Sequence, residues 1–224
     1  MWHKGNRTII FNFHGLGEMR RCGQDDEVDY QLHVDQFAEI LDVLKTRPWV
    51  RITFDDSLES DAAIALPLLR RAGLRAEFFI LAGEIDQPGH LSSNNVAELA
   101  KAGMLIGSHG MHHRDWTKID DDGLRSELVE ARQRIAAVAS QAVRSVACPF
   151  GAYDRRVLAS LRTHEFSRIY TSDGGYAYDS RWLQPRNTVK AHHDAHTIAA
   201  IADYGWPVSQ RIVQRTKRLY KRLR

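Results

Sequence analysis

Hydrophobic runs and amphipathic stretches alternate along most of the chain. Residues 8–13 (TIIFNF) and 50–54 (VRITF) are short apolar runs of the kind that form buried strands. Residues 34–45 lie between them and repeat their apolar side chains at helical spacing. The same signals predict strands at 76–81, 104–106 and 145–147, and helices at 62–71, 94–102 (with Ser93 as N-cap), 121–139 and 155–162. Such alternation is typical of βα units around a parallel sheet or barrel.

The pattern contains no internal repeat and no Pro- or Ser-rich linker, so we expect one domain over residues 1–206 and a terminal helix over 207–224. The 224 residues are 43% hydrophobic, which suffices for a sizeable core and argues against disorder.

No apolar run approaches the ~20 residues of a membrane-spanning helix. The first residues lack a signal-peptide core, so we expect a cytoplasmic protein. Cys22 and Cys148 are too few for a disulfide framework and are expected to be reduced thiols.

Positive charge is concentrated at the end of the chain. Residues 205–224 contain seven Arg or Lys and no acidic residue, whereas the remainder has 24 basic and 28 acidic residues. Over 207–224, one helical face carries apolar side chains and the adjoining stripe carries arginines: Val208, Ile212, Leu219 and Leu223, then Arg211, Arg215, Arg218 and Arg222. This helix could rest on an anionic membrane surface, or pack its apolar face on the barrel and leave its charges in water. No nucleic-acid-binding motif accompanies the charge, so no nucleic-acid partner is expected.

Polar residues follow several of the expected strands. In βα barrels the loops after the strands converge over one mouth, and catalytic residues collect there. His14 follows the first strand, Asp55 and Asp56 follow the second, His109 follows the fourth, and Cys148–Gly151 follows the fifth. We therefore expect these side chains to lie close together.

Asp56, His109 and His113 could form a metal site. The two histidines are four residues apart, which brings both imidazoles to one face of a helical turn or tight loop. With a strand-end carboxylate they make a His-His-Asp set that suits Zn²⁺, and less decisively Co²⁺, Ni²⁺ or Mn²⁺. Each part also has a simpler interpretation. Asp56 or Ser57 could cap the following helix, and eleven histidines make chance pairs common.

Three motifs in order resemble the polysaccharide deacetylase family, the NodB-homology or carbohydrate esterase group that includes chitin and peptidoglycan deacetylases. Thr53–Ser57 (TFDDS) is similar to the family's Thr-Phe-Asp-Asp-Gly. Gly107–His113 (GSHGMHH) resembles its His-Ser/Thr-x-x-His motif, and Pro149–Gly151 (PFG) its Pro-Tyr/Phe-Gly motif. The resemblance covers roughly residues 9–189 and implies a distorted (β/α) barrel of the NodB-homology type.

The resemblance also implies roles for four residues of the first two motifs. Asp56, His109 and His113 would bind the metal. Asp55 would be the general base that takes a proton from water as the water attacks an amide carbonyl. The physical chemistry agrees, because a nearby cation favours the ionised form of a carboxylate.

Substrate contacts are expected mainly from the third motif and from aromatic residues. Phe150 and Gly151 would line the substrate, and a backbone N–H near Phe150 would stabilise the oxyanion. Tyr153 and Trp182 are candidate sugar-binding or wall residues, although aromatic side chains are equally often part of a core. Arg186 is a further candidate at the substrate site, or it could supply a cation that family members carry elsewhere.

The sequence departs from the family pattern in several places. Ser57 replaces a glycine, which a turn tolerates if φ stays negative. Gly110 stands where a Ser or Thr usually braces the second motif. Ala147 and Cys148 occupy the stretch where members often carry an Arg that orients the base.

The general acid has no clean match. The family's closing Leu-x-His motif has only a degraded counterpart at 191–194 (AHHD), and His14 is the other candidate for a catalytic histidine. An acid must be protonated whereas a metal ligand must be neutral, so the neighbours of each histidine decide between the roles.

The resemblance implies a metal-dependent amidohydrolase that removes N-acetyl groups from amino sugars of a polysaccharide or of its biosynthetic intermediate. The missing signal peptide favours a cytoplasmic or lipid-linked intermediate over external cell wall. An N-formyl sugar deformylase acting on a lipid-linked sugar would use the same chemistry. A catalytically lapsed carbohydrate-binding relative is the other alternative, but it has no evident use for paired Asp55 and Asp56. A purely structural metal is disfavoured, because three protein ligands leave a position open.

Overall fold

A barrel of mostly parallel strands forms the centre of the protein. The computed structural model describes residues 7–17 and 29–224. Strands β1 to β6 lie in chain order, and each pairs in parallel with the next. They span Arg7–Phe13, Val50–Phe54, Ala76–Ile80, Leu105–Ser108, Ser145–Ala147 and Arg168–Thr171. The prediction of parallel βα units is confirmed.

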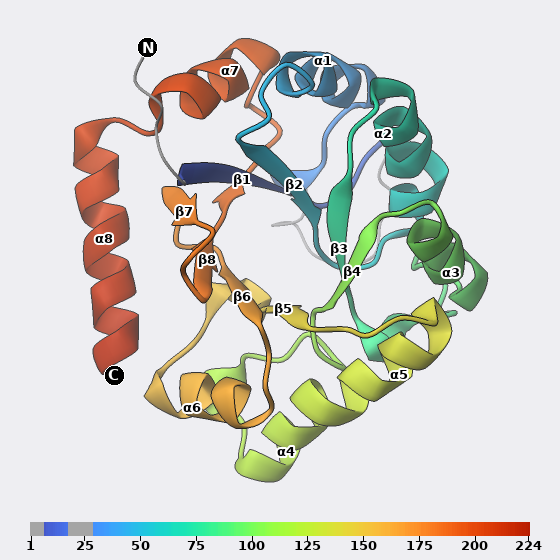
Figure 1. Cartoon of the computed structure of the whole chain (residues 1–224), viewed down its shortest axis with the longest axis vertical. Helices are drawn as coiled ribbons and strands as arrows, with labels where there is room; N and C mark the ends of the chain where they lie inside the picture. Colours follow the sequence, from blue (N-terminus) through green and yellow to red (C-terminus); the bar gives the residue numbers. More distant parts are fainter. Residues whose placement is uncertain (1–6, 18–28) are drawn as a thin grey trace.

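Three short strands extend the sheet at its edges and nearly close it. β8 (Leu183–Pro185) pairs in parallel with β6, and β7 (Tyr176–Tyr178) pairs antiparallel with β1. β9 (Asn187–Thr188) also pairs with β1, in parallel. Figure 1 shows the strands around a central axis with the helices outside them. The fold is the predicted distorted (β/α) barrel.

Helices α1 to α7 cover the outer face of the barrel with their apolar sides. They are α1 (Val34–Leu44), α2 (Leu66–Ala72), α3 (Ser93–Lys101), α4 (Asp121–Arg125), α5 (Ala131–Ala139), α6 (Arg155–Thr163) and α7 (Ala195–Tyr204), and α8 (Val208–Leu223) follows them. Single π-helical turns, Asp61–Ala65 and Ser126–Glu130, lead into α2 and α5. Under α1, the ring of Phe54 stacks on Phe78 with centroids 4.8 Å apart and on Phe13 at 5.5 Å. This aromatic stack fixes the outer faces of β1, β2 and β3 against the helical layer.

Alternation along the strands directs a polar set into the barrel. Phe11 and Phe13 of β1 belong to the outer core, whereas Asn12 between them hydrogen-bonds across the interior. On β3, Glu77 is buried and accepts hydrogen bonds from Ser145 and from the Tyr170 hydroxyl at 2.7 Å. The barrel interior is therefore a packed layer of polar and aromatic side chains. At the C-terminal ends of the strands this layer supports the residues that follow them.

The sequence pattern does not predict β6 to β9 or α7. The strands are two to four residues long, and β8 contains Gln184 and Pro185, so none forms a distinctive apolar run. Two smaller differences concern boundaries. The N-cap of α3 is Ser92, which accepts from Asn95 N at 3.1 Å, and not Ser93. β4 begins and ends later than the predicted 104–106.

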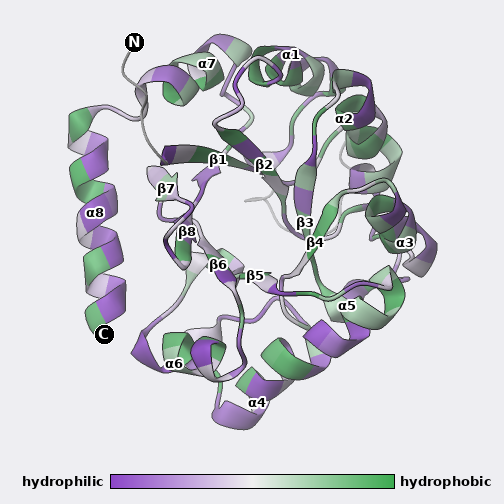
Figure 2. Ribbon diagram, viewed as in Figure 1, coloured by the Kyte–Doolittle hydropathy of each residue, from purple (hydrophilic) through white to green (hydrophobic). Residues whose placement is uncertain are grey.

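α8 lies along the barrel edge that β7 and β8 form, and its C-terminal end contacts the start of α6, where Arg155 N donates to the Arg224 carbonyl at 3.1 Å (Figure 1). Its polar side faces the barrel. Arg218 Nη2 donates to the Gly174 carbonyl at 2.9 Å, and Lys221 Nζ pairs with Asp173 at 2.7 Å. The apolar residues predicted on one face, Val208, Ile212, Leu219 and Leu223, are 58–68% exposed. The alternative in which this face packs on the barrel is therefore wrong. Figure 2 shows hydrophobic and hydrophilic residues alternating along the helix.

Membrane contact through α8 stays a prediction. Among the described residues, no helix combines the length and the apolar composition needed to cross a bilayer.

Candidate metal centre and active site

Three ligand atoms from two loops converge at the mouth of the barrel. Asp56 follows β2, and His109 and His113 follow β4. Asp56 Oδ1 lies 3.5 Å from His109 Nε2 and 3.6 Å from His113 Nε2, and one ligand atom of each residue lies within 4.8 Å of the others. Ligand atoms around a tetrahedral zinc ion are roughly 3.4 Å apart. The predicted His-His-Asp set is thus assembled at a separation that suits a divalent metal.

Two further observations fit this donor set to a metal. Asp56 Oδ1 is buried and has no hydrogen-bond partner among the described residues, which is costly unless an ion satisfies it. The Nδ1 atom of His109 lies 3.0 Å from the Ala147 carbonyl. A proton donated from Nδ1 to that carbonyl leaves the Nε2 lone pair free toward Asp56, which is the usual support of a metal-binding histidine.

The Asp56–Ser57 turn requires a left-handed backbone. φ is +74° at Asp56 and +58° at Ser57, so the condition of a negative φ, under which a turn tolerates serine in place of glycine, is not met at Ser57. Its hydroxyl compensates, because Ser57 Oγ accepts a hydrogen bond from Leu81 N at 2.6 Å. Ser57 is therefore tied to the end of β3 and not to the following helix, which removes the helix-cap interpretation of this residue.

Asp55 is held beside the metal ligands by a buried cation. Arg186 Nη1 and Nη2 each donate to one oxygen of Asp55 at 2.7 Å, and Asn12 Nδ2 donates to Oδ2 at 2.9 Å. Arg186 Nη1 also donates to Asn12 Oδ1 at 2.7 Å. Arg186 is 1% exposed, so it is a partner of Asp55 and not the substrate-binding residue that was one of its two predicted roles. Its other predicted role, the missing cation, matches its position.

Electrostatics keep both neighbouring carboxylates ionised. Burial alone would raise the pKa of Asp55, but the charges of Arg186 and His109 and the hydrogen bonds from Arg186 hold that pKa well below its usual range. Burial acts in the same direction on Asp56, and the close approach of His109 and the charge of His14 lower the pKa of Asp56. Asp55 is thus a fixed anion next to the ligands.

The third motif forms one wall of the site. Phe150 is 66% exposed and its ring centroid lies 4.4 Å from that of His113. φ is +56° at Phe150 and +61° at Gly151, where an added Cβ would come within 2.9 Å of Ser172 N. This compact left-handed turn places the Phe150 ring beside His113, and its positive φ and lack of space for a Cβ explain the glycine at position 151. Cys148 is a free thiol, as predicted, and Cys22 lies outside the described residues.

Two predicted substrate contacts are wrong. Tyr153 is fully buried, and its hydroxyl donates to Asp173 at 2.7 Å, so the ring cannot stack on a sugar. Trp182 precedes β8 at the amino end of this parallel strand, opposite the mouth, and its Nε1 donates to the Phe166 carbonyl at 2.7 Å. Both rings pack in the core cluster that contains Val157.

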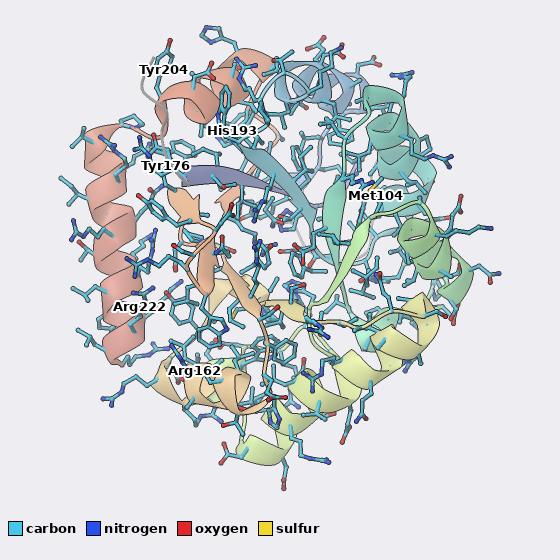
Figure 3. The ribbon with its side chains drawn as sticks, viewed as in Figure 1. Met104, Arg162, Tyr176, His193, Tyr204 and Arg222 are labelled. Carbon is cyan, nitrogen blue, oxygen red and sulfur yellow. The ribbon has the colours of Figure 1, made fainter. Side chains whose placement is uncertain are left out.

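Of the histidines considered as acid, only His14 is near the site. His14 directly follows β1, and its charge lowers the pKa of Asp55 and of Asp56. Its buried Nδ1 has no hydrogen-bond partner among the described residues. His193 instead lies 6.0 Å from the Trp206 ring and hydrogen-bonds to Lys190 N, and Figure 3 shows it beside α7.

Glu127 supports the second motif, and the sequence analysis missed it. It is 1% exposed and accepts hydrogen bonds from Met111 N at 2.8 Å, from His112 N at 3.2 Å and from Trp116 Nε1 at 3.3 Å. A side chain at Gly110 would meet Glu127 Oε2 at 2.3 Å, and φ is +92° there. The Glu127 carboxylate therefore occupies the space of the usual Ser or Thr and braces the loop between His109 and His113.

Replacing Glu127 with alanine should weaken zinc binding by about 10- to 100-fold, because residues that hold metal ligands in place have effects of this size. Zinc affinity measured by competition with a chromophoric chelator checks this. Glu130→Ala is the matched control, since Glu130 lies on the same helical segment with its side chain half exposed and pairs with Arg125. Equal zinc affinity in Glu127→Ala and Glu130→Ala would contradict the bracing role.

Comparisons with known proteins agree with the motifs. A sequence model of the polysaccharide deacetylase family matches residues 42–169, more than half of the chain. The chain is 25% identical over 128 residues to YxkH of Bacillus subtilis, and the match covers 57% of this chain and 46% of that protein. The name of YxkH assigns it to the polysaccharide deacetylases. It is 26% identical over 120 residues to a peptidoglycan-N-acetylglucosamine deacetylase of Bacillus cereus (53% and 42%). The chain thus matches less than half the length of these curated relatives.

The fold is also found among solved structures. The Streptococcus pyogenes deacetylase PplD, determined in complex with acetate, superimposes with a TM-score of 0.77 at 17% identity, over 86% of this chain and 96% of that one. At this identity the likeness concerns the fold alone.

Proposed function

Because the chain belongs to the polysaccharide deacetylase family, we propose that it is a divalent-metal-dependent hydrolase that removes N-acetyl groups from amino sugars of a polysaccharide or of its biosynthetic intermediate. One observation carries the proposal. An ionised carboxylate, Asp55, lies 3.8 Å from His109 Nε2, next to the cluster of Asp56, His109 and His113, but is itself bound by Arg186 and Asn12. A ligand set with a separate anion beside it is suited to hydrolysis and has no evident use in a binding module.

Asp56, His109 and His113 would hold the ion. A divalent metal here, most simply Zn²⁺, supplies a Lewis acid for the attacking water and for the amide carbonyl. The donor set of two nitrogens and one oxygen would also accept Co²⁺, Ni²⁺ or Mn²⁺.

Asp55 would take the proton of the attacking water. Its bidentate contact with Arg186 fixes the orientation of the carboxylate and keeps it ionised, so the base is ready at neutral pH. The exposed ring of Phe150 would bound the acetamido group on one side, and the backbone N–H near Phe150 would stabilise the developing oxyanion.

His14 would return a proton to the leaving amine. Its position after β1 and its electrostatic effect on Asp55 and Asp56 support this assignment, since an acid must act at the same mouth as the base. Action in the cytoplasm, expected from the sequence, belongs to the proposal.

Acetate release from N-acetylglucosamine oligomers by zinc-loaded protein tests the proposal. N-formylglucosamine oligomers, assayed for formate, serve as the comparison. Acetate release supports the deacetylase. Formate release alone would replace it with a deformylase, and a zinc-loaded protein that releases neither would favour the lapsed carbohydrate-binding relative.

A further inference from the structure

An open cavity of about 580 Å³ lies between α8 and the barrel edge formed by β7 and β8, away from the metal centre. Its lining includes five arginines: Arg181 between β7 and β8, and Arg211, Arg215, Arg218 and Arg222 on α8. Among the residues that the structure describes, no acidic side chain lines it. Arg222 on α8 and Tyr176 on β7, both at this cavity, are labelled in Figure 3. The five-arginine cavity is therefore a concentration of positive charge at the outside of the barrel.

None of these five guanidinium groups forms an ion pair with a carboxylate in the part of the chain that the structure describes. Two acidic residues of the same part of the chain are otherwise occupied, because Asp179 pairs with Arg51 at 2.5 Å and Asp173 pairs with Lys221 at 2.7 Å. Like charges that share one cavity repel each other, so an anion from outside the chain would stabilise this arrangement.

Buried polar atoms in the cavity wall also lack partners. Arg218 donates from Nη2 to the Gly174 carbonyl, but its Nε is buried without a hydrogen-bond partner among the described residues. The same holds for Oε1 of Gln214, one turn earlier on α8. Gln214 Oε1 is an acceptor, so the unsatisfied buried donor that indicates an anionic ligand or a water at the wall is Arg218 Nε.

The cavity is a fixed feature of the fold, because α8 is anchored at two places beside it. Arg218 holds α8 to the Gly174 carbonyl. One turn later Lys221 Nζ donates to the Gly151 carbonyl at 2.8 Å and pairs with buried Asp173. Arg211 and Arg215 precede these anchors and Arg222 follows them, so α8 presents these arginines from one side of the space, and Arg181 lies on the other side.

We propose that the five-arginine cavity binds a diphosphate or two closely spaced phosphate groups of a phosphorylated ligand. Guanidinium groups bind phosphate oxygens in a bidentate manner, and several convergent ones favour a multiply charged anion over a single carboxylate. The volume is in the range of small-ligand sites, and the rings of Tyr176 and Tyr178 in the same wall could contact a sugar or base attached to the phosphates. This site does not depend on the proposed deacetylase activity.

Isothermal titration calorimetry of the full chain with inorganic pyrophosphate tests the site. Arg215→Gln/Arg222→Gln removes two cavity arginines that have no described anchoring contact. Lys217→Gln/Arg224→Gln removes the same charge from α8 and from the residue that follows it, at positions that do not line the cavity. We expect the affinity for pyrophosphate to fall by at least about tenfold in the first pair and to stay near wild type in the control pair. No binding by wild type, or an equal loss in both pairs, would overturn the proposal.

Co-sedimentation with vesicles separates a lipid headgroup from a soluble phosphate compound. Sedimentation with phosphatidic acid vesicles that pyrophosphate competes away and Arg215→Gln/Arg222→Gln abolishes would assign the phosphate to a lipid. Pyrophosphate binding without sedimentation would assign it to a soluble ligand. If sedimentation depends on exposed Ile212 and Leu223 and not on the cavity arginines, and pyrophosphate does not bind, the proposal is wrong and α8 contacts the membrane through its apolar face.

Discussion

Asp55→Asn should lower kcat for acetate release by about 10²- to 10⁴-fold while the protein keeps its metal. The substitution removes the proton acceptor, and general acid–base groups contribute rate factors of this size. The ligand cluster comprises Asp56, His109 and His113, so metal binding should survive. The measurement is kcat together with the metal content of the same preparation by mass spectrometry.

The adjacent carboxylate provides the matched comparison. Asp56→Asn makes the same replacement of a carboxylate by an amide in the neighbouring side chain. It removes a metal ligand, so we expect both metal binding and turnover to be lost. If Asp55→Asn loses metal as completely as Asp56→Asn, Asp55 is a ligand and its role as base is wrong. Full turnover in Asp55→Asn would also exclude that role.

Arg186→Met should destabilise the metal-free protein by roughly 3–5 kcal/mol, because it leaves the Asp55 carboxylate buried without its counter-ion. Both side chains are nearly inaccessible, at 0% for Arg186 and 4% for Asp55, and both guanidinium nitrogens contact the carboxylate. Urea unfolding in the presence of a chelator gives the free energy of unfolding. A loss below about 1 kcal/mol would contradict the buried pair.

The double variant Asp55→Asn/Arg186→Met separates the pair from other effects. It removes both charges, so it should be more stable than Arg186→Met alone, and the coupling energy follows from the cycle. The pH dependence supplies a second readout. The pKa of Asp55 is lowered in the folded state from the ordinary 3.8, so the pair stabilises the protein above that value and its contribution is lost as the pH falls through the folded pKa. This acid sensitivity should be reduced in the double variant.

The sequence predicts the first part of the barrel well and the last part poorly. β1, β2, β3 and β5 are apolar runs, and their expected bounds differ from the observed ones by at most one residue. The later strands are short and gain their stability from partners far away in sequence, as when Arg168–Thr171 pairs with both β5 and β8. Such pairings leave no local period to detect. The face of α8 that packs on the barrel could not be predicted either, because an amphipathic pattern does not say which face packs.

At the site, local motifs were predictable and their supports were not. Asp56, His109 and His113 belong to motifs whose spacing is visible in the sequence. Glu127 had no such signal, because a carboxylate within a helical pattern is normally solvated. Asn12, by contrast, is a polar residue at an alternating position in an apolar run, and that alternation could have indicated an inward contact.

Aromatic residues were the least predictable part of the site. In the sequence, a tyrosine of the core looks the same as a tyrosine of a sugar-binding wall. Only the burial of Tyr153 and its hydrogen bond to Asp173 show that it belongs to the core. Arg186 could be named as a candidate cation, but its contact with Asp55 spans 131 residues and needed the closed barrel to be seen.

The most direct test of the account is the zinc content per chain, with acetate release from the same preparation, in wild type, His113→Ala and His112→Ala. His112 is the neighbouring histidine and lies outside the ligand cluster, so it controls for loss of an imidazole in this loop. We predict about one zinc ion per chain and full acetate release in wild type and His112→Ala, and loss of both in His113→Ala. Zinc binding and acetate release in His113→Ala at the wild-type level would contradict the metal centre and the function that rests on it.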